Sequence, residues 1–376
     1  MAGPRRTKNG PPGPGLVKAS TKIGPDEKLG EKDGGSRYDV RTMGEDSQKK
    51  VQAKVIELLF GNLASSTRSA YALGWKHWVQ YRESRGAPIF LDTSSTDRYN
   101  ASERDLLEFI AGEAVNFHLR PGTIRVKVYA IRHMHIVNGQ GNILESFPRV
   151  QVALKALKKE GAQGARKMPV DRRSLARIAD AMNLGQAGRT NDPSHAAVWA
   201  HICLSFFFLL RHSEAQALRA DHVKPMRKGD HINRWGDEDA IQVMIESSKC
   251  DQLNAGCIRT QGRVGGIMCP AWAVRNLRKV FPTVAQDGYD GPLCTEDGIH
   301  PIHRDSIQAW LKYGAEANGI PADRIGTHSL RIGGATALYN IGWECWKIQR
   351  FGRWKSDAFH GYLWDKVGEG DQTSTL

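Results

Sequence analysis

The sequence predicts a mainly α-helical protein of two domains, with a small β-hairpin in the second. Apolar residues recur at helical spacing from about 49 to 160, which indicates an all-helical first domain. A segment bearing Gly, Lys and Pro follows at 161–169 and predicts a linker. Between Ala240 and Glu246, Ile and Val residues alternate with other side chains, a pattern typical of a strand.

The chain begins with a basic segment, residues 1–48, that is rich in Gly, Pro and charge. Such a segment buries too little apolar surface to fold by itself, so we expect a disordered tail. The segment contains Arg5, Arg6 and Lys8 beside prolines, which fits a nuclear localisation signal or an arm that contacts DNA. The alternative is a plain solvated tail.

The helical domain, residues 49–160, is expected to contain five helices. Ser102 with Asp105 resembles a capping arrangement and predicts a helix start. Trp75 and Trp78 are expected in the core. Basic residues on these helices are candidates for contacts with DNA phosphates, the alternative being a solvated face. These candidates are Lys76, Arg125, Lys127 and Arg132.

The second domain, residues 170–376, mixes helices with the hairpin. The apolar run from Ala196 to Leu210 predicts a buried helix, and the strand at 240–246 is expected to pair with one beginning at Cys257 after a turn at 254–256. Further helices are expected at 175–182, 270–280, 304–318, 328–341 and 355–364.

Composition narrows the function classes. Lys and Arg number 53 against 40 Asp and Glu, and the net charge of +13 indicates a polyanionic partner, nucleic acid before membrane. The longest apolar run is too short to span a bilayer. The six cysteines show neither metal-site spacing nor the density of a secreted disulfide framework, so free thiols are expected. We expect an intracellular protein, nuclear if the host is a eukaryote.

Two pairs of residues indicate phosphate chemistry. Arg211 is expected where the buried helix emerges, with Glu214 three residues on to orient its guanidinium. Thr327 is a plausible N-cap, which places His328 and Arg331 together at a helix start, a favourable seat for a phosphate. Taken alone, each pair also fits an ordinary surface contact.

The order of these residues resembles the tyrosine recombinase (phage integrase) family. The motifs Ser248-Lys249-x-Asp251-Gln252 and Gly352-Arg353-Trp354-x-Ser356-Asp357-Ala358 are most similar to recombinases of eukaryotic mobile elements of the DIRS and Crypton kind. The resemblance covers both domains and implies a helical core-binding domain followed by a mixed α+β catalytic domain. The catalytic residues that it implies are Arg211, Lys249, His328, Arg331, Trp354 and Tyr362, with Glu214 in support.

The resemblance also implies a reaction. Tyr362 would attack a DNA phosphate and form a 3′-phosphotyrosine intermediate. Arg211 and Arg331 would hold the phosphate, and Trp354 would donate its indole N–H to it. His328 would assist proton transfer, and the hairpin lysine, Lys249, would protonate the departing 5′ oxygen.

The resemblance implies double-stranded DNA as the partner, bound by a homotetramer, with no membrane association. No cofactor and no divalent metal is expected, because fixed cations supply the positive charge. One departure is the interval from Trp354 to Tyr362, which is eight residues, one shorter than the usual bacterial and phage pattern. Tyr339, the other tyrosine of this region, is expected in the core.

Three other interpretations remain open. A type IB topoisomerase shares the chemistry but relaxes supercoils as a monomer. A domesticated DNA-binding protein would keep the fold without turnover. A structural basic protein would have no salt-sensitive affinity for DNA.

Overall fold

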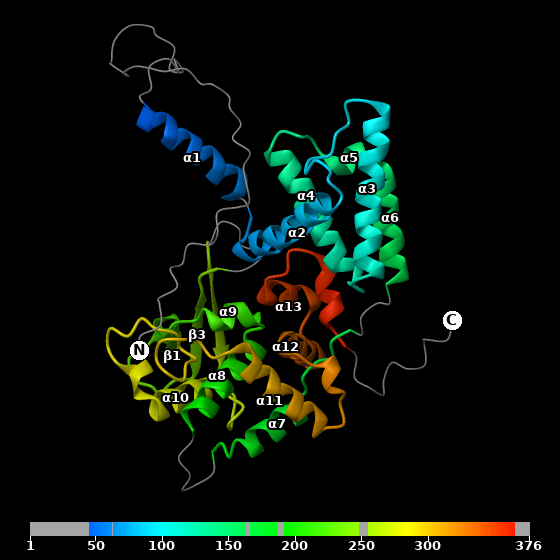
Figure 1. The fold of residues 1–376 in the computed structure, drawn as a ribbon. Coiled ribbons are helices and arrows are strands. Elements are labelled where there is room, and N and C mark those ends of the chain that lie inside the picture. The colour runs from blue at the N-terminus through cyan, green and yellow to red at the C-terminus, as the bar shows by residue number, and fades with distance from the viewer. Residues whose placement is uncertain (1–44, 62, 162–165, 186–191, 248–254, 365–376) are drawn as a thin grey trace, which may run out of the picture. The chain divides into compact units, whose positions relative to one another are not determined.

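The structure, a computed structural model, describes residues 45–61, 63–161, 166–185, 192–247 and 255–364. The chain forms two compact units, unit 1 (Met1–Gly164) and unit 2 (Ala165–Leu376), which are described separately (Figure 1). None of the helices in these described ranges combines the length and apolar character needed to cross a membrane.

Unit 1 is helical throughout its described part. Its helices are α1 (Glu45–Gly61), α2 (Ser65–Ser84), α3 (Thr96–Val115), α4 (Pro121–Val137), α5 (Ile143–Ser146) and α6 (Pro148–Glu160). The core includes Trp75 and Trp78, whose burial was predicted, together with Leu106, Ile131 and Phe147. Helical periodicity therefore identified both the class and the core of this unit.

Helix α3 begins six residues before the predicted cap. Ser95 is the N-cap, and its hydroxyl accepts a hydrogen bond from the Arg98 N–H at 3.3 Å. Ser102 lies inside the helix, where its hydroxyl donates to the Asp92 carbonyl at 3.0 Å. The predicted capping role of Ser102 is wrong because its partner comes from the preceding loop.

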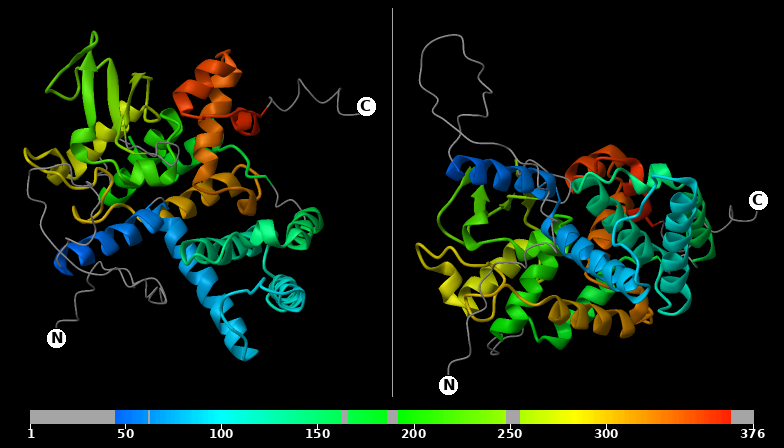
Figure 2. Two further views of the ribbon diagram at one scale, coloured as in Figure 1. Left: turned by 90° about the horizontal axis from the view of Figure 1, so that it is seen from above. Right: turned by 45° about the horizontal axis from the view of Figure 1, so that its top comes forward.

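Unit 2 is built around α8 (Pro193–Phe207). Every residue of α8 from Ala196 to Phe206 is buried, as expected for a helix that is apolar on all sides. The other helices are α7 (Arg172–Ala181), α9 (His212–Gln216), α10 (Pro270–Val280), α11 (Arg304–Glu316), α12 (His328–Asn340) and α13 (Cys345–Gly352). Helices α10, α11 and α12 pack against α8 (Figure 2).

A four-stranded antiparallel sheet in the order β2-β1-β3-β4 completes unit 2. Its strands are β1 (Val223–Arg227), β2 (Asp230–His231), β3 (Ala240–Ile245) and β4 (Cys257–Gly262). The predicted hairpin is β3 and β4, with Met244 opposite Ile258. Strand β1 was missed because it contains Pro225, which argues against a strand, and β2 is only two residues long. The predicted class, mainly α with a small sheet, is confirmed.

The prediction of an α-helix at 355–364 is wrong. Residues Asp357–Tyr362 form a short 3₁₀ helix, η5, after an extended Ser356. The eight-residue helix α13 precedes it and was missed because so short an element carries little periodicity. Arg353 ends α13 in the left-handed conformation, with φ of 62°.

Helix α12 packs unusually close to its neighbours. A Cβ atom on Gly333 would lie 2.1 Å from the Val170 carbonyl oxygen, and one on Gly334 would lie 2.1 Å from that of Phe206. Both distances are far below van der Waals contact, so only glycine fits. The second turn of α12, directly after His328 and Arg331, is thereby packed against α8 and against the chain at Val170.

Candidate active site

The first part of the site is the turn between α8 and α9. Leu209 has a φ of 50°, and Arg211 follows in an extended conformation as the N-cap of α9. The Arg211 backbone N–H donates to Glu214 Oε2 at 2.9 Å, and its guanidinium donates to Oε1 at 2.6 Å. The predicted pair thus forms within a single helical turn, and 18 % of the Arg211 side chain remains exposed.

Three guanidinium groups share the Glu214 carboxylate. Besides Arg211, the Arg353 guanidinium donates to Oε2 at 2.6 Å, and Arg331 lies 3.8 Å from the same oxygen. Burial raises the pKa of Glu214, but the nearby arginines and the Arg211 N–H outweigh it, so the net pKa is below its ordinary value. Glu214 is therefore a charged, buried anchor for three cations.

Arg331 lies fully buried on α12. Its two terminal nitrogens donate to the carbonyls of Leu209 and Gly352, and its guanidinium carbon lies 4.1 Å from the centroid of the Trp354 ring. Burial and the positive charges of Arg211 and Arg353 lower the pKa of Arg331 to about 9. Its Nε has no hydrogen-bond partner among the described residues.

The pair that carries the proposed chemistry is His328 with Tyr362. His328 Nε2 lies 3.0 Å from the Tyr362 hydroxyl oxygen, although the residues are 34 positions apart. Partial burial and the charges of Arg331 and Arg211 lower the pKa of His328. A neutral imidazole at this position can accept the phenolic proton. Thr327 is the N-cap residue of α12, as predicted, but its side chain makes no capping hydrogen bond.

Trp354 packs inside the site. Its ring centroid lies 4.9 Å from that of Tyr362, and a Cβ on Gly352 would come within 1.6 Å of the indole. The indole Nε1 is buried and has no partner among the described residues. A donation from Trp354 to a phosphate therefore requires its neighbours to move.

Arg353 is the residue that sequence reasoning missed. Its side chain donates to Glu214 and to the carbonyls of Phe208 and Leu209 at 3.3 and 3.1 Å. The signal was its spacing, since the interval from Arg353 to Tyr362 is nine residues, one more than from Trp354. The left-handed backbone of Arg353 turns its side chain toward the α8–α9 turn.

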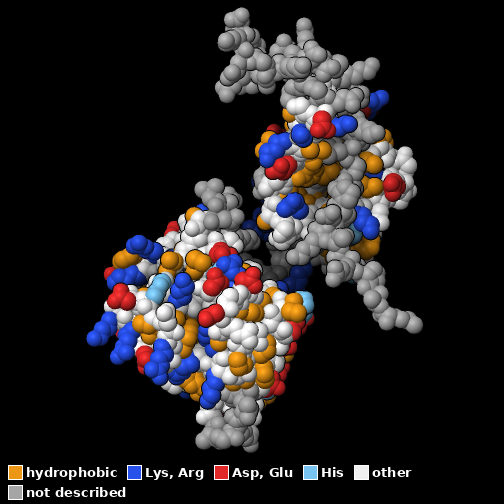
Figure 3. All heavy atoms as spheres, turned by 90° about the vertical axis from the view of Figure 1, so that its left-hand side faces the viewer, with side chains coloured by type: hydrophobic (Ala, Val, Ile, Leu, Met, Phe, Trp, Pro, Cys, Tyr) orange, Lys and Arg blue, Asp and Glu red, His pale blue; other side chains and the backbone are white. Residues whose placement is uncertain are grey.

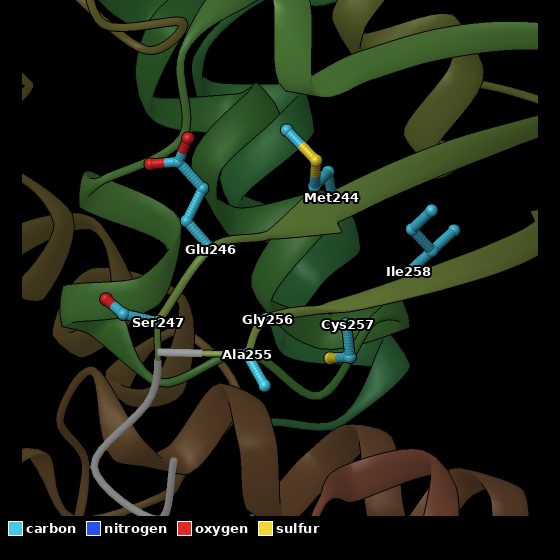
Figure 4. A pocket seen from close by; sticks show the side chains of 7 residues that line it. All are labelled: Met244, Glu246, Ser247, Ala255, Gly256, Cys257 and Ile258. Atoms are coloured by element: carbon cyan, nitrogen blue, oxygen red, sulfur yellow. The ribbon is translucent and has the colours of Figure 1, made fainter. Parts of the chain in front are cut away.

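The predicted lysine, Lys249, lies outside the described residues. At the described end of the hairpin is a pocket of about 790 Å³ between the end of β3 and the start of β4 (Figure 4). On β4, the Arg259 side chain donates to the carbonyls of Phe351 and Arg350 at 3.1 and 3.0 Å. Arg259 therefore ties the hairpin to the helix that ends at Arg353.

The four predicted DNA-contact residues of unit 1 differ in exposure. Lys76 and Arg125 are exposed, and Arg132 is half-buried with its Nε donating to Asn142 Oδ1 at 2.8 Å. Lys127 is buried and paired with Glu113, so its prediction as a surface contact is wrong.

On the face drawn in Figure 3, the basic side chains do not form one continuous patch. Basic side chains there are interspersed with acidic and hydrophobic ones. This view therefore does not single out one patch as the DNA-contacting surface.

Tyr339 is 37 % exposed near the end of α12, so its predicted place in the core is wrong. The structure thus brings together five of the six predicted catalytic residues, Arg211, His328, Arg331, Trp354 and Tyr362, with Glu214 at their centre.

No protein-family model and no curated relative matches the sequence. Several solved structures are similar to the chain. A lambda integrase (residues 75 to 356) dimer bound to a COC′ core site matches with a TM-score of 0.50 and 12 % identity over 88 % of this chain and 99 % of that chain.

Two further structures match slightly less well. The Tn1549 transposon integrase with transposon right end DNA has a TM-score of 0.49 at 13 % identity, over 85 % of this chain and 95 % of that one. XerH recombinase bound to difH substrate has a TM-score of 0.48 at 14 % identity, over 87 % of this chain and 83 % of that one. The lambda integrase match shows that the chain shares the fold of lambda integrase, in agreement with the fold that the motif resemblance implied.

Proposed function

We propose that this protein is a site-specific DNA recombinase or integrase that cuts and rejoins DNA through a 3′-phosphotyrosine intermediate. The observation that carries the proposal is the 3.0 Å contact between His328 and Tyr362 beside a buried cluster of arginines. A phenol next to a base and to fixed cations is what attack on a phosphodiester requires.

The proposed step balances as a transesterification. The Tyr362 oxygen bonds to phosphorus, the bond from phosphorus to the 5′ oxygen breaks, and the phenolic proton passes to His328. Arg211 is the partly exposed cation nearest to solvent in the cluster, so it meets the non-bridging oxygens first. Lys249 is proposed from its motif alone to protonate the 5′ oxygen.

The phosphotyrosine bond keeps the free energy of the phosphodiester. A 5′ hydroxyl of a second strand can therefore attack it and release Tyr362 without ATP. Double-stranded DNA is the proposed substrate, and a homotetramer on two duplexes is the proposed assembly. The XerH structures, described as pre-cleavage and post-cleavage complexes with difH DNA, are consistent with this kind of reaction in a protein of the same fold.

The test is covalent trapping. The protein is incubated with a library of nicked duplexes, denatured, digested with protease, and searched by mass spectrometry for nucleotide-modified peptides. We expect the modification on the peptide that contains Tyr362. Salt-sensitive DNA binding with no adduct would overturn the proposal in favour of a binding protein without turnover. An adduct without exchange between two marked duplexes would favour a type IB topoisomerase.

The pH dependence of adduct formation tests His328. Burial and the charges of Arg331 and Arg211 lower the pKa of His328 from its ordinary 6.5, so its neutral form predominates at pH 6.5 and above. We expect the rate to hold over that range and to fall at lower pH, where a protonated ring accepts no proton. His328→Gln should lower the rate of adduct formation at neutral pH on the order of a hundredfold. It should also remove the fall in rate at acidic pH.

His231→Gln is the matched control for this measurement, because His231 is exposed on β2 and bonds only to Gln242 among the contacts found for it. It should keep the wild-type profile. A His328→Gln variant that retains the acidic limb would show that another group titrates.

A further inference from the structure

Arg166 contacts the chain on both sides of Tyr362. Its guanidinium donates to the carbonyl of Gly361 and, at 3.1 Å, to that of Leu363. The same group lies 4.5 Å from the centroid of the Trp364 ring. Gly361 and Leu363 adjoin Tyr362 on either side and Trp364 follows Leu363, so one arginine contacts the chain before and after the tyrosine.

The backbone of the Arg166 segment is itself fixed to the start of α12. The Arg166 carbonyl accepts from Arg324 Nε at 2.8 Å, and the Met168 N–H donates to the Arg324 carbonyl at 2.9 Å. Two residues on, the Val170 N–H donates to the Ser329 carbonyl at 3.1 Å, next to His328. The Arg166 segment is therefore bonded to Arg324, four residues before His328, and to Ser329, the residue after it.

Besides Arg166, the segment that carries Tyr362 is attached through the Tyr362 hydroxyl to His328, through ring contacts of Tyr362 and Phe359 with Trp354, and through the Tyr362 carbonyl. It is a short 3₁₀ helix, and the Tyr362 carbonyl accepts one hydrogen bond, at 3.0 Å, from the Thr336 hydroxyl. A planar guanidinium can serve two carbonyls while stacking on an indole, whereas an ammonium is a single point charge. The chemistry of the contact therefore requires arginine.

We propose that Arg166 is a positioning residue for the nucleophile. It holds the main chain around Tyr362 in register with His328, so that the phenol stays within hydrogen-bonding distance of its base. The role in catalysis rests on the function proposed above, while the anchoring itself does not. Arg166 lies in the segment that the sequence predicted as a linker, so sequence reasoning gave it no role.

The anchoring is tested first in the DNA-free protein. Hydrogen exchange is measured on the peptide that covers residues 359–364 in the full chain, for wild type, Arg166→Ala and Arg166→Lys. We expect faster exchange in Arg166→Ala, an intermediate rate in Arg166→Lys, and unchanged melting temperatures. Arg173→Ala, which removes the same charge from an exposed position on α7, is the matched control. Unchanged exchange in Arg166→Ala would overturn the proposal.

The consequence for chemistry is tested by adduct formation on a captured nicked duplex. At saturating DNA, Arg166→Ala should form the adduct on the order of ten- to a hundredfold more slowly, because small misplacements of reacting groups have effects of this size. The apparent DNA affinity should match that of Arg173→Ala, and Arg166→Lys should recover part of the rate. An unchanged or faster rate would overturn the positioning role. If wild type forms no adduct, the proposed function fails, and hydrogen exchange alone decides the anchoring.

Discussion

Tyr362→Phe is expected to abolish the covalent protein–DNA adduct while DNA affinity stays within about twofold of wild type. The substitution removes only the hydroxyl that contacts His328 at 3.0 Å. The ring remains. Its centroid lies 4.9 Å from that of the Trp354 ring and 5.9 Å from the guanidinium carbon of Arg331, and both contacts are kept. The measurement is adduct yield after denaturation, with affinity measured in parallel over a range of salt concentrations.

Tyr339→Phe is the control, because Tyr339 lies on α12 but is exposed near its end. It should form the adduct at the wild-type rate. If the adduct survives in Tyr362→Phe, the nucleophile is another residue, and the eight-residue interval after Trp354 would then mark a real change of register.

Glu214→Ala is expected to lower the free energy of unfolding by about 3–5 kcal/mol, because it leaves buried guanidinium groups without their carboxylate. Arg331 and Arg353 are both buried against Glu214, with 0 % and 9 % of their side chains exposed. Urea denaturation measures the effect. Glu316→Ala, at an exposed position near the end of α11, should change the unfolding free energy little. Equal losses in the two variants would contradict the anchor role.

The same carboxylate predicts the direction of the pH effect. The pKa of Glu214 is lower in the folded protein than its ordinary 4.5, so its stabilising contribution is complete above that pH. The contribution is lost as the pH falls through the folded-state pKa. We therefore expect the difference in unfolding free energy between wild type and Glu214→Ala to shrink below pH 4.5. A difference that is constant with pH would mean that the carboxylate charge is not what stabilises the cluster.

Local patterns predicted much of the architecture. The buried helix at 196–210 and the strand at 240–246 were found because apolar periodicity depends on neighbouring residues alone. The pairing of Arg211 with Glu214 was likewise predictable, since the two residues lie within one turn. The fold class follows from information of this kind, whereas most site residues were identified through the resemblance of their motifs to the tyrosine recombinase family.

Contacts between distant positions were harder to predict. Arg353 reaches Glu214 across 139 positions, and nothing local indicates that its guanidinium turns inward. Lys127 was assigned to the surface from its charge, but Glu113 on the neighbouring helix pairs with it in the core. In both cases the deciding partner lies on another element, so only the tertiary structure identifies it.

The buried arginines also link the stability of the protein to its activity. Burial lowers the pKa of Arg331, and repulsion from Arg211 and Arg353 lowers it further, so its charged form is disfavoured where it lies. Without a ligand, this repulsion lowers the free energy of unfolding. A bound phosphate is negative and would relieve the repulsion. Ligands that bind only the native state stabilise it by mass action. Under the function proposed above, a bound DNA phosphate would therefore stabilise the native protein partly by relieving repulsion that the unliganded protein carries.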